Sequence, residues 1–437
     1  MGNVLSYVAG VFLVLGLMIL VHELGHFLAA RIFGVRVDVF SFGIGPRLFG
    51  YRRGPTDYRV SLLPLGGYVR LAGSDPSEER SGAPEEYLSR PRWRRAIIAS
   101  AGPVMNVMAA IVLMTGVFHA GFPRPAFLDQ PARIGAVDKD SPAAKAAIQP
   151  GDLIVRLENW QNPRWEKINF EVLSSAWRPL SITIRRGEQE LQTSIQPVAQ
   201  GREQTGYAGW LPSEPAIIGS VEPGKPADRA GLRPGDEIIA LDGDRVWSRD
   251  LLSRLQQIGD RETTLTVLRA GQNLDSRVRP AFMERGGQKV WAIGVSLPQP
   301  ITLRSLPLHL AFVESLDWNY RNCGMIFDVV IRLFERRLSL RALGGPIDIT
   351  RQSGEAAQRG LLDLVYFMAL ISLNLAVLNI LPIPILDGGH ILVLAVEGTI
   401  RRDLSLRLKE RIVQLGLVFL ILIFGIVMYN DILKLTR

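Results

Sequence analysis

Residues 20 to 30, LVHELGHFLAA, place two histidines and a glutamate in an otherwise apolar run. His22 and His26 are four residues apart, so on a helix both can present nitrogen to one metal ion. Zinc is the natural candidate, because neutral imidazole suits it and a catalytic zinc keeps one position open for water. Glu23 stands where a carboxylate can take a proton from that water and pass it to a leaving amine. The pattern predicts a hydrolase with one zinc ion.

A third protein ligand is expected far downstream, in NILPIPILDGGH. Asp387 and the two histidines each lie at the cytoplasmic end of an apolar run, so they can meet at equal depth. The two prolines before Asp387 interrupt a regular helix, and the two glycines after it permit a tight chain reversal. Irregular backbone at membrane depth is tolerated where it lines a watered cavity. His390 is a rival ligand, which we rank as a residue that supports the ligands.

Four apolar stretches indicate membrane helices, judged against the ~20 apolar residues that one crossing needs. Hydrophobic residues make up 47% of the 437, and the mean hydropathy is +0.16. The first stretch has neither a preceding basic region nor a following cleavage site, so it is predicted to be a retained helix rather than a signal peptide. The stretches run roughly from 4 to 28, 97 to 118, 361 to 382 and 411 to 429.

Arginine-rich loops follow the first and third stretches, and the bias of basic residues toward the cytoplasm makes both loops cytoplasmic. Both termini and the block from 120 to 360 then lie outside, on the periplasmic face of a bacterial inner membrane. Segment 307–335 carries recurrent charges and is predicted to be an amphipathic helix in contact with membrane lipid. The net charge of +8 comes without a nucleic-acid-binding motif, so no nucleic-acid partner is expected. The single cysteine, Cys323, excludes an intrachain disulfide.

The outer block contains an internal repeat. IGAVDKDSPAAKAAIQPGDLIVRLEN from Ile134 aligns without a gap with IGSVEPGKPADRAGLRPGDEIIALDG from Ile218. Short strands, a helix opened by proline and a Pro-Gly-Asp turn resemble PDZ domains, which bind an extended peptide at a sheet edge. We expect two PDZ-like α+β modules, at 125–200 and 205–298, that contact peptides or proteins; a structural spacer is the alternative.

The predicted fold is therefore a polytopic α-helical membrane protein with four transmembrane helices and two PDZ-like modules inserted between the second and third helices. The predicted segments are a first helix with the zinc motif (1–34), a cytoplasmic loop with a membrane-associated β-hairpin (35–95), a second helix (96–119), the two modules, membrane-proximal amphipathic helices (303–358), a third helix with the LDG motif (361–397), a cytoplasmic loop (398–410) and a fourth helix (411–430).

HELGH in the first helix, the two PDZ-like modules and LDG after the third helix together resemble the site-2 protease family, of peptidase M50 type. The resemblance covers nearly the whole chain. It implies intramembrane proteolysis with zinc held by His22, His26 and Asp387, and with Glu23 as the catalytic carboxylate. It also implies a single-span substrate already trimmed outside, such as an anti-sigma factor in the sigma-E stress response, or remnant signal peptides. The modules would then act as a size filter.

Two segments are candidates for binding the substrate. YRVSLLPLGGYVRL, residues 58 to 71, alternates and then turns at Gly66 and Gly67, which predicts a hairpin whose edge holds the substrate extended; a packing hairpin is the alternative. The amide of Asn379 can bond to an unwound substrate backbone. Asn106, in the second helix, is assigned to helix packing.

A membrane peptide-binding receptor or scaffold with a structural zinc is the second functional hypothesis. A structural site would be closed by four protein ligands and would have no use for a free carboxylate such as Glu23. A metal transporter is disfavoured, because the helices show no inverted repeat.

Overall fold

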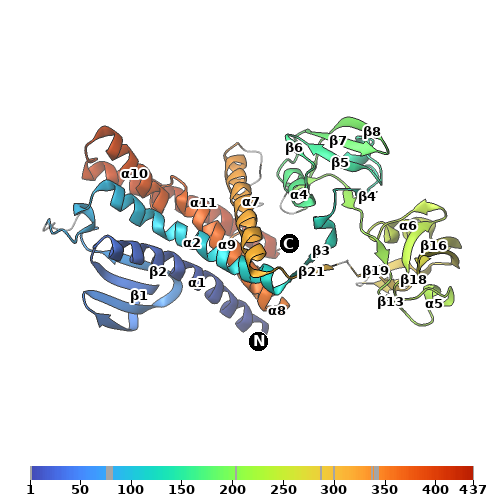
Figure 1. Ribbon diagram of the computed structural model, residues 1–437, viewed down its shortest axis with the longest axis horizontal. Helices are drawn as coiled ribbons and strands as arrows, with labels where there is room; N and C mark the ends of the chain where they lie inside the picture. Colours follow the sequence, from blue (N-terminus) through green and yellow to red (C-terminus); the bar gives the residue numbers. More distant parts are fainter. Residues whose placement is uncertain are drawn as a thin grey trace. The chain divides into compact units, whose positions relative to one another are not determined.

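The apolar runs form long α-helices, and four of the described helices are long and apolar enough to cross a membrane, as expected (Figure 1). An α-helix satisfies its backbone hydrogen bonds internally, which a span through lipid requires. The four helices are α1 (Gly2–Ile32), α2 (Arg92–Ala120), α9 (Leu361–Ile380) and α11 (Leu406–Thr436).

The structure is a computed structural model, and it describes residues 2–74, 82–201, 204–285, 288–298, 301–335, 338 and 344–436. The chain divides into two compact units. The first unit comprises Met1–Phe122, Arg304–Phe334 and Leu340–Arg437, and therefore contains the four candidate membrane helices. The second unit comprises Pro123–Leu303 and Glu335–Ser339.

Small residues allow the helices of the first unit to approach closely. Where α1 meets α2, a Cβ added to Gly25 would lie 2.2 Å from the carbonyl oxygen of Ala101, so a side chain does not fit there. Small-residue contacts of this kind are how membrane helices pack in the absence of a hydrophobic driving force between them. Further along α2, Ala110 and Met114 share a buried cluster with Ala369 of α9.

Helix α7 (Leu308–Phe334) packs against α2 and α9. Ala311 and Trp318 are buried in this contact, and the hydroxyl of Ser315 lies 2.9 Å from that of Thr115 on α2. Helix α7 is not among the four helices that are apolar enough to cross a membrane. It forms one continuous helix through most of the segment that the sequence predicts to be amphipathic.

Two long strands, β1 (Val37–Arg53) and β2 (Thr56–Leu71), form a sheet that follows α1 in the chain. The chain reverses between them at Gly54, whose φ of +62° glycine adopts without strain. Val39 pairs with Arg70 on one side and with Asp57 on the other, so the start of β1 lies between the two ends of β2.

The expected reversal of the chain near Gly66 and Gly67 is present, although its two arms do not pair with each other as a simple hairpin. Residues 57–60 run parallel to residues 39–42 on one edge of β1, and residues 67–70 run antiparallel to them on the other edge, so the chain turns back between Leu63 and Gly67. A Cβ on Gly67 would lie 2.9 Å from the carbonyl oxygen of Ser41, so glycine allows the close approach of the two strands.

The second unit contains two copies of one arrangement, each closed by a strand that returns to the first strand of its copy. The first copy consists of β4 (Ile134–Val137), α3 (Pro142–Lys145), β5 (Leu153–Leu157), β6 (Trp160–Gln161), α4 (Trp165–Leu173), β7 (Leu180–Arg186), β8 (Gln189–Ile195) and β11 (Trp210–Pro212). The second consists of β13 (Ser220–Val221), α5 (Pro226–Arg229), β14 (Glu237–Leu241), β15 (Asp244–Arg245), α6 (Leu251–Ile258), β16 (Thr263–Arg269), β17 (Gln272–Val278) and β20 (Val295–Ser296).

The Pro-Gly-Asp turn of each copy carries a buried ion pair. Nε of Arg186 donates to Asp152 at 2.8 Å in the first copy, and Nε of Arg269 donates to Asp236 at 2.7 Å in the second. The backbone N–H of Arg233 also donates to Asp236. The repeated aspartate of the sequence thus links the turn to the hairpin that follows the longer helix of each copy.

The remaining elements are short or connect the larger ones. They are η1 (Tyr87–Ser89), β3 (Phe122–Pro125), which pairs with β21 (Ile301–Arg304), η2 (Ala126–Asp129), β9 (Val198–Gln200), β10 (Thr205–Tyr207), β12 (Ala216–Ile217), β18 (Ala281–Arg285), β19 (Gln288–Ala292), α8 (Pro346–Arg359) and α10 (Asp387–Ile400).

Candidate metal centre

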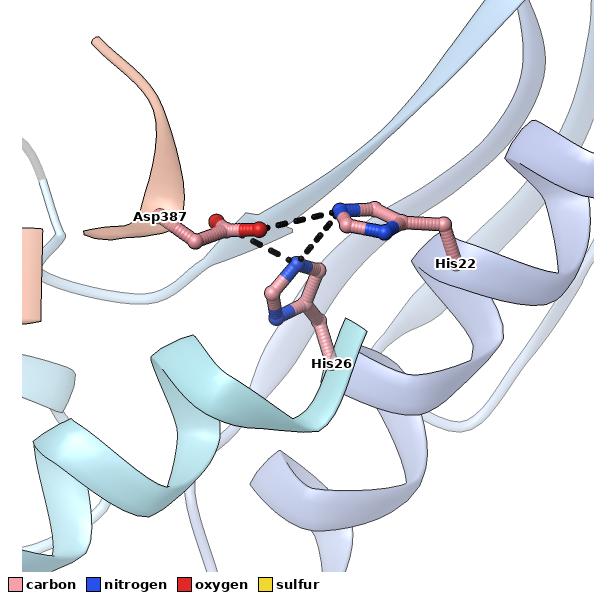
Figure 2. Close-up of side chains that lie close together, drawn as sticks. All are labelled: His22, His26 and Asp387. Atoms are coloured by element: carbon pink, nitrogen blue, oxygen red, sulfur yellow. Dashed lines mark hydrogen bonds and ion pairs between the residues drawn. The ribbon is translucent and has the colours of Figure 1, made fainter. Parts of the chain in front are cut away.

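Three side chains that are far apart in the sequence converge inside the first unit (Figure 2). His22 and His26 project from α1, and Asp387 is the first residue of α10. Nε2 of His22 lies 3.0 Å from Oδ2 of Asp387, and Nε2 of His26 lies 3.4 Å from Oδ1. The two Nε2 atoms are 3.2 Å apart. The three residues that the sequence predicts as metal ligands therefore lie together in one site.

The donor atoms and their separations fit zinc. A tetrahedral zinc ion with bonds of about 2.0–2.1 Å holds its ligand atoms roughly 3.3 Å apart. The measured separations of 3.0, 3.2 and 3.4 Å bracket that value. No further His, Cys, Asp or Glu of the described residues joins the group, so one position of a tetrahedron is left open, as in catalytic zinc sites.

The irregular segment before Asp387 follows from its prolines. Helix α9 ends at Ile380, and Pro382 and Pro384 lack the amide donors that a helix would need. The expectation that glycine provides a chain reversal here is wrong, because Gly388 lies inside α10 without a positive φ. A Cβ on Gly388 would lie 2.2 Å from the carbonyl oxygen of Ile380. Glycine therefore lets the first turn of α10 pack against the end of α9.

Helix α2 orients both histidines. Nδ1 of His26 lies 2.8 Å from the carbonyl oxygen of Ile98, so Nδ1 carries the proton and Nε2 is free for a metal. Nδ1 of His22 lies 3.4 Å from the amide Nδ2 of Asn106, which is fully buried. The hydroxyl of Ser372 donates to the backbone carbonyl of Asn106 and ties α9 to this position.

Asn106 supports His22 as a metal ligand better when the oxygen and nitrogen of its side-chain amide exchange places. Its Oδ1 has no hydrogen-bond partner among the described residues. Rotating the amide by half a turn exchanges the positions of its oxygen and nitrogen and points Oδ1 at Nδ1 of His22. Oδ1 then accepts the Nδ1 proton and leaves Nε2 for the metal. The assignment of Asn106 to packing therefore missed this contact, although a polar residue inside an apolar span was a signal.

The three converging side chains face a cavity of about 640 Å³. Glu23, Asn379 and His390 line the same cavity. His390 is not part of the group that could hold a metal, which agrees with its rank below Asp387. Glu23 comes from α1, Asn379 from the end of α9 and His390 from the first turn of α10.

The two glycines predicted to contact the substrate differ in their positions. A Cβ on Gly67 would lie 3.1 Å from Cγ of Glu23, so this glycine lies directly beside the candidate catalytic carboxylate. Gly66 instead lies against the side chain of Ile44, and neither glycine is among the residues that line the cavity. Tyr68 and Val69, the next residues of β2, do line it.

Tyr87 and Arg95 also line the cavity, and the sequence analysis assigned no role to either. Burial raises the pKa of the Tyr87 hydroxyl to about 12, so the hydroxyl stays protonated at neutral pH. It donates to the backbone carbonyl of Arg95 at 3.3 Å. Tyr87 lies in the cytoplasm-side loop of the predicted topology and Arg95 in an arginine cluster, so neither stands out in the sequence.

An HExxH helix and an aspartate from a second helix that meet in a cavity among apolar helices define a zinc metalloprotease of the membrane-embedded class. The chain belongs to peptidase family M50, whose family model matches residues 10–423. This confirms the resemblance to site-2 proteases and the assignment as a zinc metalloprotease.

Relatives match almost the whole chain. The regulator of sigma-E protease RseP of Escherichia coli (strain K12) is 30% identical over 96% of this chain and 97% of its own length. A protein of Salmonella typhimurium with the same name is 29% identical over 99% and 100%. A Treponema pallidum relative, named as a zinc metalloprotease, is 33% identical over 96% and 97%. Among solved structures, the PDZ domain of an SdrC-like protein from Listeria monocytogenes matches 18% of this chain and 84% of its own, with 21% identity and a TM-score of 0.17.

Proposed function

We propose that this protein is an intramembrane endopeptidase that cleaves the transmembrane segment of a single-span protein already trimmed on its outer side. The observation that carries the proposal is the convergence of His22, His26 and Asp387 in a cavity among helices apolar enough to cross a membrane. A peptide bond within the membrane is accessible only to a site at that depth. Relatives named as regulators of sigma-E protease support an anti-sigma factor as the type of substrate, with remnant signal peptides as a second type.

His22, His26 and Asp387 would hold one zinc ion, and Glu23 would act as the general acid and base. Zinc in this position supplies Lewis-acid chemistry, because it polarises a peptide carbonyl and makes water more acidic. Glu23 takes a proton from the attacking water and delivers it to the amine that leaves. The backbone N–H of Val69 donates to the Glu23 carboxylate, so the end of β2 orients this side chain. Gly67 leaves room for it.

The end of β2 would bind the substrate in extended form. Residues 67–71 pair with β1 on one side, and Tyr68 and Val69 line the cavity. A peptide bond in a helix is shielded and internally hydrogen bonded, so the substrate must unwind before it is cut. A strand edge can then accept the unwound segment through backbone hydrogen bonds. Asn379 lines the same cavity and offers a side-chain amide to the same backbone.

The two copies in the second unit would act as PDZ-like modules that screen substrates. The second copy has a cavity of about 600 Å³ beside α6 and β20, lined by Leu251, Leu255 and Val295 among others. An apolar groove between a helix and a strand suits the end of an extended peptide. In the first copy Trp165, the first residue of α4, is fully buried and packs against Phe127.

We infer from the basic loops that the active site faces the cytoplasmic side of a bacterial inner membrane, with the termini and modules on the periplasmic side. The modules then meet a substrate on the side where it has been trimmed. A large outer domain would be excluded before it reached the membrane helices.

The decisive experiment compares the parent protein with Glu23→Gln, which keeps the size of the side chain and removes its charge. The substrate is a single-span protein without its outer domain, and Glu410→Gln on the exposed face of α11 is the control. We expect about one zinc per chain in all three proteins, and cleavage within the transmembrane segment at a rate reduced by about 10²–10⁴-fold only in Glu23→Gln. Parental cleavage by Glu23→Gln would remove Glu23 from the mechanism. Cleavage outside the transmembrane segment would overturn the proposed substrate class.

A further inference from the structure

A buried arginine faces the cavity of the metal site without a partner. Arg95, in the first turn of α2, is 6% exposed and lines this cavity. Its Nε has no hydrogen-bond partner, and its guanidinium forms no ion pair with any carboxylate of the described part of the chain. Arginine is rarely buried this deeply unless it is paired.

The position of Arg95 relative to the metal site follows from the helix. Gly102, whose added Cβ would touch both histidines, lies seven residues after Arg95, which places the two residues on one face of α2. Seven residues at 1.5 Å each separate them by about 10 Å along the helix axis. Ile98 and Ala99, between them, line the cavity as well. Arg95 and the metal site therefore lie along the same face of α2, which forms part of the cavity wall, at different positions along the helix axis.

Two basic residues near Arg95, Arg92 and Lys409, are already paired with carboxylates. Arg92, three residues before Arg95, donates to Asp403 at 2.7 Å. Lys409 lies 2.6 Å from the fully buried Glu397, and both line the cavity. Of the described arginine and lysine residues that line the cavity, Lys409 has a carboxylate within ion-pair distance and Arg95 has none. Asp403, which is paired with Arg92, interacts with Arg95 only at longer range.

We propose that Arg95 is a binding residue for a peptide carboxylate inside the cavity. An uncompensated buried charge is costly, and an anionic ligand offsets that cost. Arginine binds carboxylates through two parallel N–H donors, which a water molecule cannot match. The inference rests on the proposed function, because a peptidase brings peptides into this cavity.

Two peptide groups carry this chemistry. Hydrolysis adds water across the peptide bond: the carbonyl carbon gains the oxygen and leaves as a carboxylate, and the nitrogen gains a proton and leaves as an amine. The new terminal carboxylate lies beside the Glu23 carboxylate, which repels it, and Arg95 offers it a cation in the same cavity. The other source is an acidic side chain of the substrate, about three residues from the scissile bond at ~3.3 Å per residue.

The test measures peptide binding without cleavage. Zinc-loaded, full-length Glu23→Gln protein in detergent is titrated with fluorescent apolar peptides: one with a free terminal carboxylate, its amide twin, and two amides with Glu or Gln three residues from the end. The same titrations use the additional variants Arg95→Gln, Arg95→Lys and Arg92→Gln. Arg92→Gln is the matched control, because it removes a neighbouring arginine that is paired with Asp403.

We expect a carboxylate-bearing peptide to bind about tenfold more tightly than its neutral twin, the ratio typical of one charged hydrogen-bonded pair. The ratio should fall to about one in Arg95→Gln, recover in part in Arg95→Lys and stay at tenfold in Arg92→Gln. Preference for the free terminus identifies the product, and preference for Glu identifies the acidic side chain.

If the tenfold ratio of peptide affinities persists in Arg95→Gln, the carboxylate binds elsewhere and the proposal is overturned. The proposal is also overturned if the Glu23→Gln protein that retains Arg95 shows no preference for the carboxylate-bearing peptide. If Arg95→Gln does not fold, a ratio in Arg95→Lys equal to that of the parent would equally count against the bidentate contact. The cleavage assay tests whether the protein is an intramembrane peptidase, and the ratio of peptide affinities tests the role of Arg95. The two proposals can therefore fail independently.

Discussion

Gly102 of α2 lies against His26 of α1, so close that a Cβ at Gly102 would be 2.4 Å from Nε2 of the histidine. Real Cβ atoms essentially never approach another atom within 3.0 Å. The same Cβ would lie 2.7 Å from Nε2 of His22. Helix α2 thus shapes the proposed metal site although it supplies no ligand.

Replacement of Gly102 by alanine should displace the two histidine nitrogens and weaken zinc binding at least tenfold, with loss of cleavage. Gly116→Ala, on the same helix with no atom within 4 Å of the added Cβ, is the control and should change neither property. Zinc per chain after dialysis against a graded chelator series measures the effect. Retention of parental affinity by Gly102→Ala would show that the histidines do not bind zinc where the structure places them.

Asn106→Leu should weaken zinc binding by about 10–100-fold, because the proton on Nδ1 of His22 loses its acceptor. Chelator competition at equilibrium measures this affinity. Asn322→Leu on α7, whose amide bonds to its own helix at the carbonyl of Trp318, serves as the control. Equal zinc affinity in the two variants would return Asn106 to a packing role.

Asp431 connects the last helix to α8. It is 2% exposed, and its carboxylate accepts the backbone N–H groups of Gly345, Ile347 and Asp348 at 3.0–3.2 Å. Asp431→Ala leaves these donors unpaired and should lower the free energy of unfolding by about 1–3 kcal/mol. Thermal unfolding in detergent tests this against Glu410→Ala, an exposed residue of the same helix expected to stay within about 0.5 kcal/mol of the parent. Equal shifts in both variants would contradict the capping role.

The second copy in the outer unit should lose stability in acid. Hydrogen bonds from Arg269 hold the pKa of Asp236 below its usual range. An unfolded aspartate takes up its proton near pH ~3.9, so the stabilisation is present above that pH and is lost as the pH falls through the lower folded pKa.

Hydrogen exchange of residues 218–297 in the full-length protein measures this loss. Asp236→Asn should exchange faster than the parent at neutral pH, and the difference should disappear in strong acid. Asp244→Asn, whose side chain is 85% exposed, should match the parent at both pH values. A difference between Asp236→Asn and the parent that persists unchanged into strong acid would contradict the ion-pair explanation.

The membrane helices could be predicted from local properties of the sequence. The length and apolar composition of α1, α2, α9 and α11 predict membrane spans without any knowledge of contacts. The pairing of β1 with β2 could not be predicted in the same way. Val39 pairs with Arg70 on one side and with Asp57 on the other. Which part of β2 lies at which edge of β1 depends on how the whole sheet folds.

The site could be predicted only as far as its ligands. His22 and His26 share a helix face by spacing alone, and Asp387 follows from matching depth. The contact of Asn106 with His22 spans 84 residues and depends on the rotation of α2 about its axis, which the closest approach at Gly25 fixes. Arg95 is one of several arginines in a row, and only burial separates it from the others.

The central claim is that His22, His26 and Asp387 are the protein ligands of one zinc ion. Zinc content and X-ray absorption at the zinc edge, measured on the parent, Asp387→Asn and His390→Gln, test it most directly. We expect one zinc per chain in the parent and in His390→Gln, with two imidazole nitrogens and a carboxylate oxygen bound to it at about 2.0–2.2 Å in both proteins. Asp387→Asn should lose zinc or that oxygen. Loss of zinc in His390→Gln, with an unchanged shell in Asp387→Asn, would contradict the account and make His390 the third ligand.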